Sequence, residues 1–322
     1  MIMSQPTTTS GTDTAPLIKV TDIAYVRFRA PDLQKMADFL IDFGMVEFAR
    51  TDTALYMRGT GTDPYVHVTE LGEPGFIGPV FQVATEQELQ TLAHACDLPV
   101  EYRSEPGGGL VVRLMDPNGF PVEVVHGITP ALPQDDRAIV PSNDVFTKAR
   151  LNAVKRVGHG ASHVQRLGHC AIGAIDYAQS AAWYHRHLGL IKSDEIYIGE
   201  KEAVFGAFMR CDRGDMPVDH HTLFIVGTGT PGFNHAAWEV SGMDDLMLGH
   251  EVLKEKEHTP VWGVGRHILG SQVFDYWQDP WGHKVEHWTD GDLFRADHEA
   301  GLEPVDALMN TQWGKSAPPE MA

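Results

Sequence analysis

The chain contains an internal repeat, and this repeat restricts what it can fold into more than any other feature. The segments Ile23–Met45 and Leu167–Leu190 both read as a short strand, an aspartate suited to cap a helix, the helix itself and a glycine that ends it. The segments Asp116–Val125 and Asp279–Trp288 each hold an Asp-Pro-x-Gly turn followed by a strand that carries a glutamate. We therefore expect two halves that are built alike.

Each half divides once more. A second strand and helix follow in the first half at Val80–Val83 and Glu86–Ala95, and in the second half at Asn234–Val240 and Asp244–Lys254. The order strand, helix, then two or three strands thus occurs four times. It predicts an α+β fold of two domains, each made of two βαβββ modules that curl into an incomplete barrel.

The boundaries follow from the same pattern. We expect an N-terminal domain over residues 17–127 and a C-terminal domain over residues 165–290. Residues 128–164, which include Pro130, Pro133 and Pro141, read as a linker. Residues 291–322 read as a C-terminal tail, with poor order expected beyond about Pro304.

Charge and cysteine usage exclude several classes of partner. With 25 basic and 44 acidic residues the formal net charge is −19, which makes nucleic acid and anionic membrane poor partners. The longest apolar runs fall short of a bilayer span, and the first sixteen residues do not resemble a signal peptide. Three widely spaced cysteines suit a reducing compartment, so we expect a cytoplasmic protein.

Histidine is concentrated in the second half. Of 17 histidines, only His67, His94 and His126 fall within residues 1–150. Because histidine is the commonest metal ligand and exchanges protons near neutral pH, we expect any metal site in the second half.

Strand alternation selects three candidate ligands there. His169 alternates with Leu167 and Ala171, His235 alternates with Phe233 and Ala237, and Glu286 alternates with Lys284 and Trp288. Two imidazoles and one carboxylate on three neighbouring strands would occupy one face of an octahedron and leave the other positions open. Such a facial triad is typical of non-haem Fe(II) enzymes that use O2.

Other groups that can move protons lie close in sequence. Tyr276 falls on the strand that pairs with the strand of Glu286, and His267 lies nine residues before Tyr276. His220 and His221 directly precede the strand at 222–226. This set suits an enzyme that deprotonates a phenolic substrate.

These residues carry a resemblance to the type I extradiol ring-cleaving dioxygenases of the vicinal oxygen chelate superfamily. Their signature is matched by Gly265-Arg266-His267, Tyr276, Asp279-Pro280-Trp281-Gly282 and Glu286. Asp275 departs from it, because the pattern has an apolar residue before the tyrosine. The stretches around His169 (LGHCAI), His221 (HHTLF) and His235 (FNHAAWEV) extend the resemblance.

The resemblance implies the function and the roles of the site residues. The protein is expected to cleave a catechol-type ring, or a substituted hydroquinone or trihydroxy ring, with O2 at Fe(II), with Mn(II) as the other candidate metal, and to form a homo-oligomer. His221 is preferred over His220 as the base, because the family's base directly precedes the threonine of the next strand. The implied metal ligands are His169, His235 and Glu286, and the implied catalytic residues are His221, His267 and Tyr276.

The first half resembles the vestigial domain of that family. Aligned on the repeat, Tyr25 stands in place of His169 and roughly Gly78 in place of His235, while Glu123 remains opposite Glu286. One carboxylate cannot hold an ion, so this half is expected to be structural. Two alternative functions on the same scaffold stay open: a glyoxalase-like metal-dependent isomerase or thiol transferase, and a non-catalytic protein that sequesters a drug.

Overall fold

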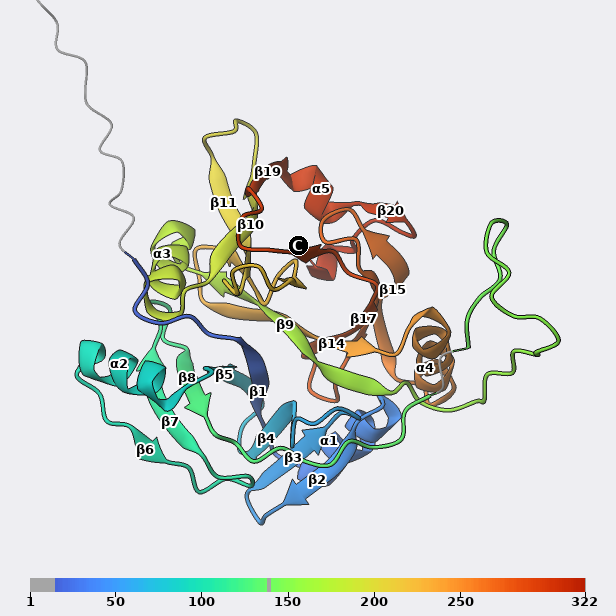
Figure 1. Cartoon of the computed structure of the whole chain (residues 1–322), viewed down its shortest axis with the longest axis horizontal. Helices are drawn as coiled ribbons and strands as arrows, with labels where there is room; N and C mark the ends of the chain where they lie inside the picture. Colours follow the sequence, from blue (N-terminus) through green and yellow to red (C-terminus); the bar gives the residue numbers. More distant parts are fainter. Residues whose placement is uncertain (1–14, 138–139, 322) are drawn as a thin grey trace, which may run out of the picture.

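The computed structural model of the chain describes residues 15–137 and 140–321. Its first half forms an eight-stranded mixed sheet with two helices (Figure 1). In chain order the elements are β1 (Asp22–Ala30), α1 (Leu33–Asp42), β2 (Val46–Arg50), β3 (Ala54–Arg58), β4 (His67–Leu71), β5 (Gly75–Gln82), α2 (Glu86–Cys96), β6 (Glu101–Tyr102), β7 (Leu110–Met115) and β8 (Pro121–His126).

The second half forms a ten-stranded mixed sheet and a separate strand pair. Its elements up to the end of the repeat are β9 (Val164–Ala174), α3 (Tyr177–Leu188), β10 (Ile191–Tyr197), β11 (Val204–Arg210), β12 (Val218–Asp219), β13 (Leu223–Gly227), β14 (Gly232–Val240), α4 (Met243–Glu255), β15 (Thr259–His267), β16 (Val273–Gln278) and β17 (Lys284–Thr289).

The two sheets share one strand order. The first runs β2-β3-β4-β1-β5-β8-β7-β6, and the second contains β10-β11-β13-β9-β14-β17-β16-β15. Each order consists of two βαβββ modules joined through their first strands, which are β1 and β5 in one sheet and β9 and β14 in the other. The predicted α+β fold of repeated modules is confirmed.

The helices begin and end where the sequence indicates. Asp32 and Asp176 cap α1 and α3, with side chains that accept hydrogen bonds from backbone N–H groups of the first turn. Gly189 ends α3 in the left-handed conformation at φ 72°. After each helix the chain returns to its sheet, entering β2 after α1 and β10 after α3.

The two halves pack against each other through their central strands and one shared core, so they hold one another in place (Figure 1). The indole N–H of Trp238 donates to the carbonyl of Val66 at 3.4 Å. His287 stacks on Phe43 and its Nε2 lies 2.6 Å from that residue's carbonyl oxygen. These buried polar contacts fix how the second sheet sits on the first.

The expectation of a poorly ordered tail beyond Pro304 is wrong. Beyond Pro304, β20 (Thr311–Trp313) pairs with β15 at one edge of the second sheet, and β19 (Gly301–Pro304), directly before this segment, pairs with β10 at the other edge (Figure 1). Pairing with strands distant in sequence leaves no local signal, which is why the position at the end of the chain suggested poor order. The tail elements are β18 (Leu293–Phe294), β19 (Gly301–Pro304), α5 (Val305–Met309), β20 (Thr311–Trp313) and a 3-10 turn at Pro319–Met321.

Between the halves, residues 127–163 contain no named helix or strand among the residues described, and they run past α4 in Figure 1. Arg137 anchors this segment to Asp245 at 2.6 Å. None of the described helices is both long and apolar enough to cross a membrane.

Candidate metal centre and active site

Strand register brings the three predicted ligands together. His169 on β9 and Glu286 on β17 both lie directly beside Ala237 of β14, the strand between them. His235 precedes Ala237 by two residues, so its side chain leaves β14 on the same face. Residues far apart in sequence thus meet on one side of a rigid sheet.

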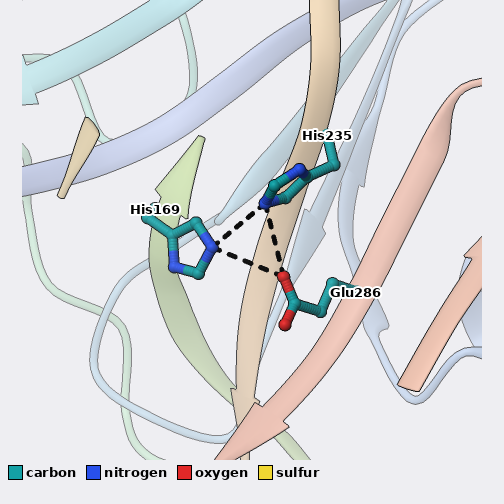
Figure 2. A group of neighbouring side chains, drawn as sticks. All are labelled: His169, His235 and Glu286. Carbon is teal, nitrogen blue, oxygen red and sulfur yellow. Dashed lines mark hydrogen bonds and ion pairs between the residues drawn. The ribbon is translucent and has the colours of Figure 1, made fainter. Parts of the chain in front are cut away.

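The donor atoms form a nearly equilateral triangle (Figure 2). Nε2 of His169 lies 3.3 Å from Nε2 of His235 and 3.4 Å from Oε2 of Glu286. Nε2 of His235 also lies 3.4 Å from Oε2 of Glu286. Donors placed at right angles about 2.1 Å from an ion would be about 3 Å apart. The triangle is therefore close to one face of a coordination octahedron.

Burial supports the same assignment. Glu286 is fully buried and neither carboxylate oxygen has a hydrogen-bond partner among the described residues. A buried carboxylate that accepts no hydrogen bond, with imidazoles no closer than 3.4 Å, is costly unless a cation neutralises it. The three side chains therefore form a site for a divalent metal ion, which their donor atoms fit.

The protonation states suit a metal as well. Burial, together with the neighbouring imidazoles, lowers the pKa of His235 to about 3, despite the Glu286 carboxylate. Burial alone would raise the pKa of Glu286, but the imidazoles of His169 and His267 outweigh it and hold the pKa below its usual range. A neutral imidazole and an ionised carboxylate are the forms that bind metal.

A hydrogen bond orients one ligand. Oδ1 of Asn234 accepts from Nδ1 of His235 at 2.8 Å, which leaves Nε2 free to bind an ion. Sequence analysis did not single out Asn234, although its position next to a ligand was the available signal.

Tyr276 and His267 stand beside the triangle as the register predicts. Tyr276 on β16 is directly opposite Glu286 on β17, and its hydroxyl lies 3.1 Å from Nε2 of His267 at the end of β15. Burial, followed by the negative charge of Glu286, raises the pKa of the Tyr276 hydroxyl well above its usual value. The hydroxyl therefore stays protonated and can donate a hydrogen bond.

His221 lies against the first ligand. Its ring centroid is 3.9 Å from that of His169 and 4.7 Å from that of Phe208. Burial and the surrounding imidazoles lower the pKa of His221 well below its usual value, which favours the neutral ring. His220 points away from the triangle and pairs with Asp194 at 2.6 Å.

Asp275 and His283, which are sequence neighbours of the site residues, make their hydrogen bonds away from the metal ligands. Asp275, the departure from the family signature, is fully buried and accepts hydrogen bonds from His250 on α4 and from the indole of Trp277. This pairing explains how a carboxylate is tolerated where an apolar side chain is the rule. His283 bonds to Asp279, so it does not approach the ligands.

His169 and His235 of the triangle, together with Tyr276 and His267, line a cavity that opens to solvent. Apart from the histidines, Tyr276, Asn234 and Gln272, its wall is apolar. Part of the wall comes from the C-terminal tail, which sequence analysis missed because its position depends on strand pairing. The lining residues not yet named in this role are Phe208, Phe224, Trp262, Leu269, Ala307, Leu308, Met309, Ala317 and Met321.

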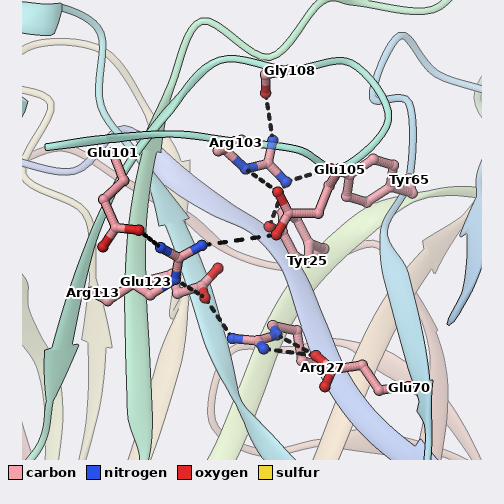
Figure 3. Close-up of polar contacts among 10 residues, drawn as sticks. All are labelled: Tyr25, Arg27, Tyr65, Glu70, Glu101, Arg103, Glu105, Gly108, Arg113 and Glu123. Atoms are coloured by element: carbon pink, nitrogen blue, oxygen red, sulfur yellow. Dashed lines mark hydrogen bonds and ion pairs between the residues drawn. The ribbon is translucent and has the colours of Figure 1, made fainter. Parts of the chain in front are cut away.

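The corresponding place in the first half is filled by ion pairs (Figure 3). Tyr25 and Glu123 flank Val80 as His169 and Glu286 flank Ala237, so the register places them at the equivalent positions. Glu123 accepts hydrogen bonds from Arg27 at 2.6 Å and from Arg113 at 3.1 Å. Protein cations thus neutralise the carboxylate that remains there.

Residues 166–287 match the family model of the glyoxalase/bleomycin resistance protein/dioxygenase superfamily. Metapyrocatechase 2 of Cupriavidus necator is 32% identical over 159 residues, which make up 48% of this chain and 46% of that protein, so the match spans about half of each. A manganese-dependent 2,3-dihydroxybiphenyl 1,2-dioxygenase of Geobacillus genomosp. 3 is 24% identical over 309 residues, covering 91% of this chain and 90% of that one.

The chain is thus similar to extradiol dioxygenases of this superfamily, within residues 166–287 and, at lower identity, over most of its length. A manganese-bound glyoxalase from Novosphingobium aromaticivorans shares the fold, with a TM-score of 0.76, 21% identity and 94% of each chain covered. At that identity the likeness concerns the fold alone. The distinction between an extradiol dioxygenase and other proteins of this fold therefore rests on the site.

Proposed function

We propose that this extradiol dioxygenase opens the ring of an uncharged catechol next to its two hydroxyls, using O2 and Fe(II). The observation that carries the proposal is the triangle of His169, His235 and Glu286, whose two histidines line a cavity. Tyr276, His267 and His221 line the same cavity, so proton donors and an acceptor surround the place where a ring would sit.

When bound, the ion would supply a Lewis-acidic, redox-active centre that holds a catechol and O2 side by side. The protein's part is to orient the ring and to place protons. The Tyr276 hydroxyl can donate to a catecholate oxygen, and Nε2 of His267, 3.1 Å away, adds a second polar contact at this end. His221 lies on the other side, against His169, where it can accept or return a proton.

Fe(II) is proposed and Mn(II) is the alternative. Nitrogen and carboxylate donors accept both ions, and one relative is named as manganese-dependent. Metal analysis of the protein as purified, followed by activity measured after loading with each ion alone, distinguishes the two. Higher turnover with Mn(II) than with Fe(II) would correct the metal without affecting the proposed reaction.

The cavity wall supports an uncharged substrate. Neither lysine nor arginine is among the lining residues that the structure describes. Lys284, opposite His235 on the neighbouring strand, lies outside that lining. A substrate carboxylate would lose its hydration against Leu308 and Met309 without gaining a partner, whereas an alkyl or aryl group would be buried favourably.

The test is anaerobic loading with Fe(II) followed by exposure to O2 with single substrates. We expect one O2 consumed per 4-ethylcatechol or 2,3-dihydroxybiphenyl, with a yellow ring-fission product. Methylglyoxal with glutathione serves as the control for a glyoxalase-like reaction. Turnover of that pair without ring fission would overturn the proposal, and so would a protein that binds aromatic compounds tightly but takes up neither iron nor manganese.

A further inference from the structure

Asp194, His220 and His221 form a hydrogen-bonded chain that runs to the edge of the active-site cavity. Oδ2 of Asp194 lies 2.6 Å from Nε2 of His220, and Nδ1 of His220 lies 3.1 Å from Nδ1 of His221. Both imidazoles are buried, at 1% and 4% exposure. Sequence analysis treated the two histidines as alternatives for one role, whereas the structure links them.

The direction of each hydrogen bond follows from the chemistry of its atoms. A carboxylate only accepts, so Nε2 of His220 carries a proton. In a neutral imidazole the other nitrogen then has none, so Nδ1 of His220 accepts from Nδ1–H of His221. The remaining nitrogen of His221, Nε2, is left with a free lone pair.

Because Nδ1 is engaged by His220, Nε2 is the nitrogen of His221 that remains for the cavity. His221 lines the cavity, and its Nδ1 edge is turned toward His220. Among the described residues, Nε2 has no hydrogen-bond partner, so nothing in the protein competes for its lone pair. We propose that Asp194 and His220 are positioning residues that fix the tautomer of His221 and present Nε2 to the substrate as an acceptor.

The surroundings hold the chain in place. The backbone N–H of His220 donates to the carbonyl of Asp292 at 2.9 Å, and the hydroxyl of Ser193 donates to the carbonyl of His220 at 2.5 Å. Gly270 lies so close that an added Cβ would be 3.0 Å from Nδ1 of His220. The His220 ring therefore has little room to rotate, and its two nitrogens keep their separate partners.

The inference rests on the proposed function, because a base is useful only if a substrate hydroxyl is deprotonated here. A direct test is ¹⁵N NMR of the Zn(II)-loaded protein with labelled histidine, the signals being assigned with His220→Phe and His221→Phe. We expect His221 protonated at Nδ1 and His220 at Nε2. Observation of His221 protonated at Nε2 would overturn the inference, since it requires a cationic His220 or a reversed bond.

Substitutions at Asp194 provide a matched pair. Asp194→Leu removes the acceptor and should release the tautomer of His221, whereas Asp194→Asn keeps an oxygen that can accept from His220. We expect kcat to fall about 100-fold in Asp194→Leu and less than about 10-fold in Asp194→Asn, with KM changed less than about threefold in both. Equal losses in the two variants, or a His221 tautomer unchanged in Asp194→Leu, would contradict the inference.

Substitutions at His220 give an independent check. His220→Phe keeps an aromatic ring beside Phe208 and Phe294 but no acceptor, and His220→Gln restores an oxygen for Nδ1–H of His221. Recovery of kcat by Gln relative to Phe supports positioning, and parallel loss of kcat and of the unfolding midpoint in both indicates a purely structural role. If the wild-type protein cleaves no catechol, the proposed function fails, while the NMR result still decides the tautomer.

Discussion

Nη1 of Arg27 lies 2.6 Å from Oε1 of Glu123, at the place in the first sheet that corresponds to the metal centre in the second. The carboxylate is 4% exposed, and the guanidinium also reaches Glu70 at 2.6 Å. The negative charge from Glu70 and Glu123 holds the pKa of Arg27 above its usual value, although burial alone would lower it. The first half has thus kept the carboxylate of the site and neutralised it with an arginine.

Replacing Arg27 should therefore destabilise the fold. In Arg27→Met the buried Glu123 keeps only Arg113, which is 40% exposed, and we expect a loss of about 3 kcal/mol in the free energy of unfolding. Urea denaturation measures this loss. Arg29→Met, an exposed neighbour on the same strand, is the control and should change stability by less than about 0.5 kcal/mol. A smaller loss in the double variant Arg27→Met/Glu123→Leu than in Arg27→Met would show that the unpaired charge is the cause.

Glu286 and Glu123 give a second matched comparison. Glu286→Gln removes the only anionic donor of the triangle, so bound metal should fall well below one ion per chain after dialysis, as measured by elemental analysis. Chelation should lower the unfolding midpoint of the wild type and leave that of Glu286→Gln unchanged. Glu123→Gln should retain full metal content, and a loss of metal there would mean that the first half takes part in binding.

Tyr276→Phe tests the hydroxyl beside the triangle. The variant keeps the ring packed on Trp262 but removes a donor whose raised pKa keeps it protonated. A hydrogen bond to a charged oxygen contributes about 1.5–3 kcal/mol, so kcat/KM for a catechol should fall about 10- to 100-fold with metal content intact. Tyr177→Phe, which removes a hydroxyl bonded to Glu195 outside the cavity, should leave kcat/KM within about twofold.

The parts of this protein that sequence reasoning reached are those with local or periodic signals. Asp176 and Gly189 bound a helix through their own chemistry, and alternation along three strands put His169, His235 and Glu286 on one face. The repeat even supplied the vestigial equivalents, since Gly78 precedes Val80 by two residues as His235 precedes Ala237. In each case the sequence signal and the tertiary arrangement have the same physical origin.

The features of the site that the sequence did not predict depend on contacts between segments distant along the chain. Nothing near Leu308 or Met309 indicates that the tail would return to cover the cavity, because that position is set by pairing of β20 with β15. The partnership of Asp194 with His220 is likewise invisible along the chain, since β10 and the loop before β13 meet only in the folded sheet. Such residues define the wall and the polarity of the site, so the sequence alone does not identify the substrate.

Acid should weaken the fold through His67, which is buried and stacked on Phe28. Burial lowers its pKa from 6.5 to about 3, so between these values the unfolded chain binds a proton that the folded chain does not. This contribution to stability is present above pH 6.5 and is lost as the pH falls toward 3. By pH 5 the loss amounts to about 2 kcal/mol. The difference in unfolding free energy between pH 7.5 and pH 5 should be smaller by that amount in His67→Phe, and an equal pH dependence in both proteins would disprove the assignment.

The apolar wall predicts that a charge introduced at one position will redirect specificity. 4-Ethylcatechol and 3,4-dihydroxyphenylacetate have similar shapes, but only the second carries a carboxylate, and the wild type should prefer the first because no cation lines the described cavity wall. Leu308→Arg should shift the ratio of kcat/KM toward the acid by about tenfold or more, since a charge-assisted hydrogen bond would then offset the lost hydration. Leu302→Arg places the same charge on β19 outside the cavity and should leave the ratio unchanged. A preference of the wild type for the acid, or an equal shift in both variants, would contradict this prediction. Either result would mean that a more distant cation interacts with the substrate carboxylate and that the wall formed by the tail does not determine specificity.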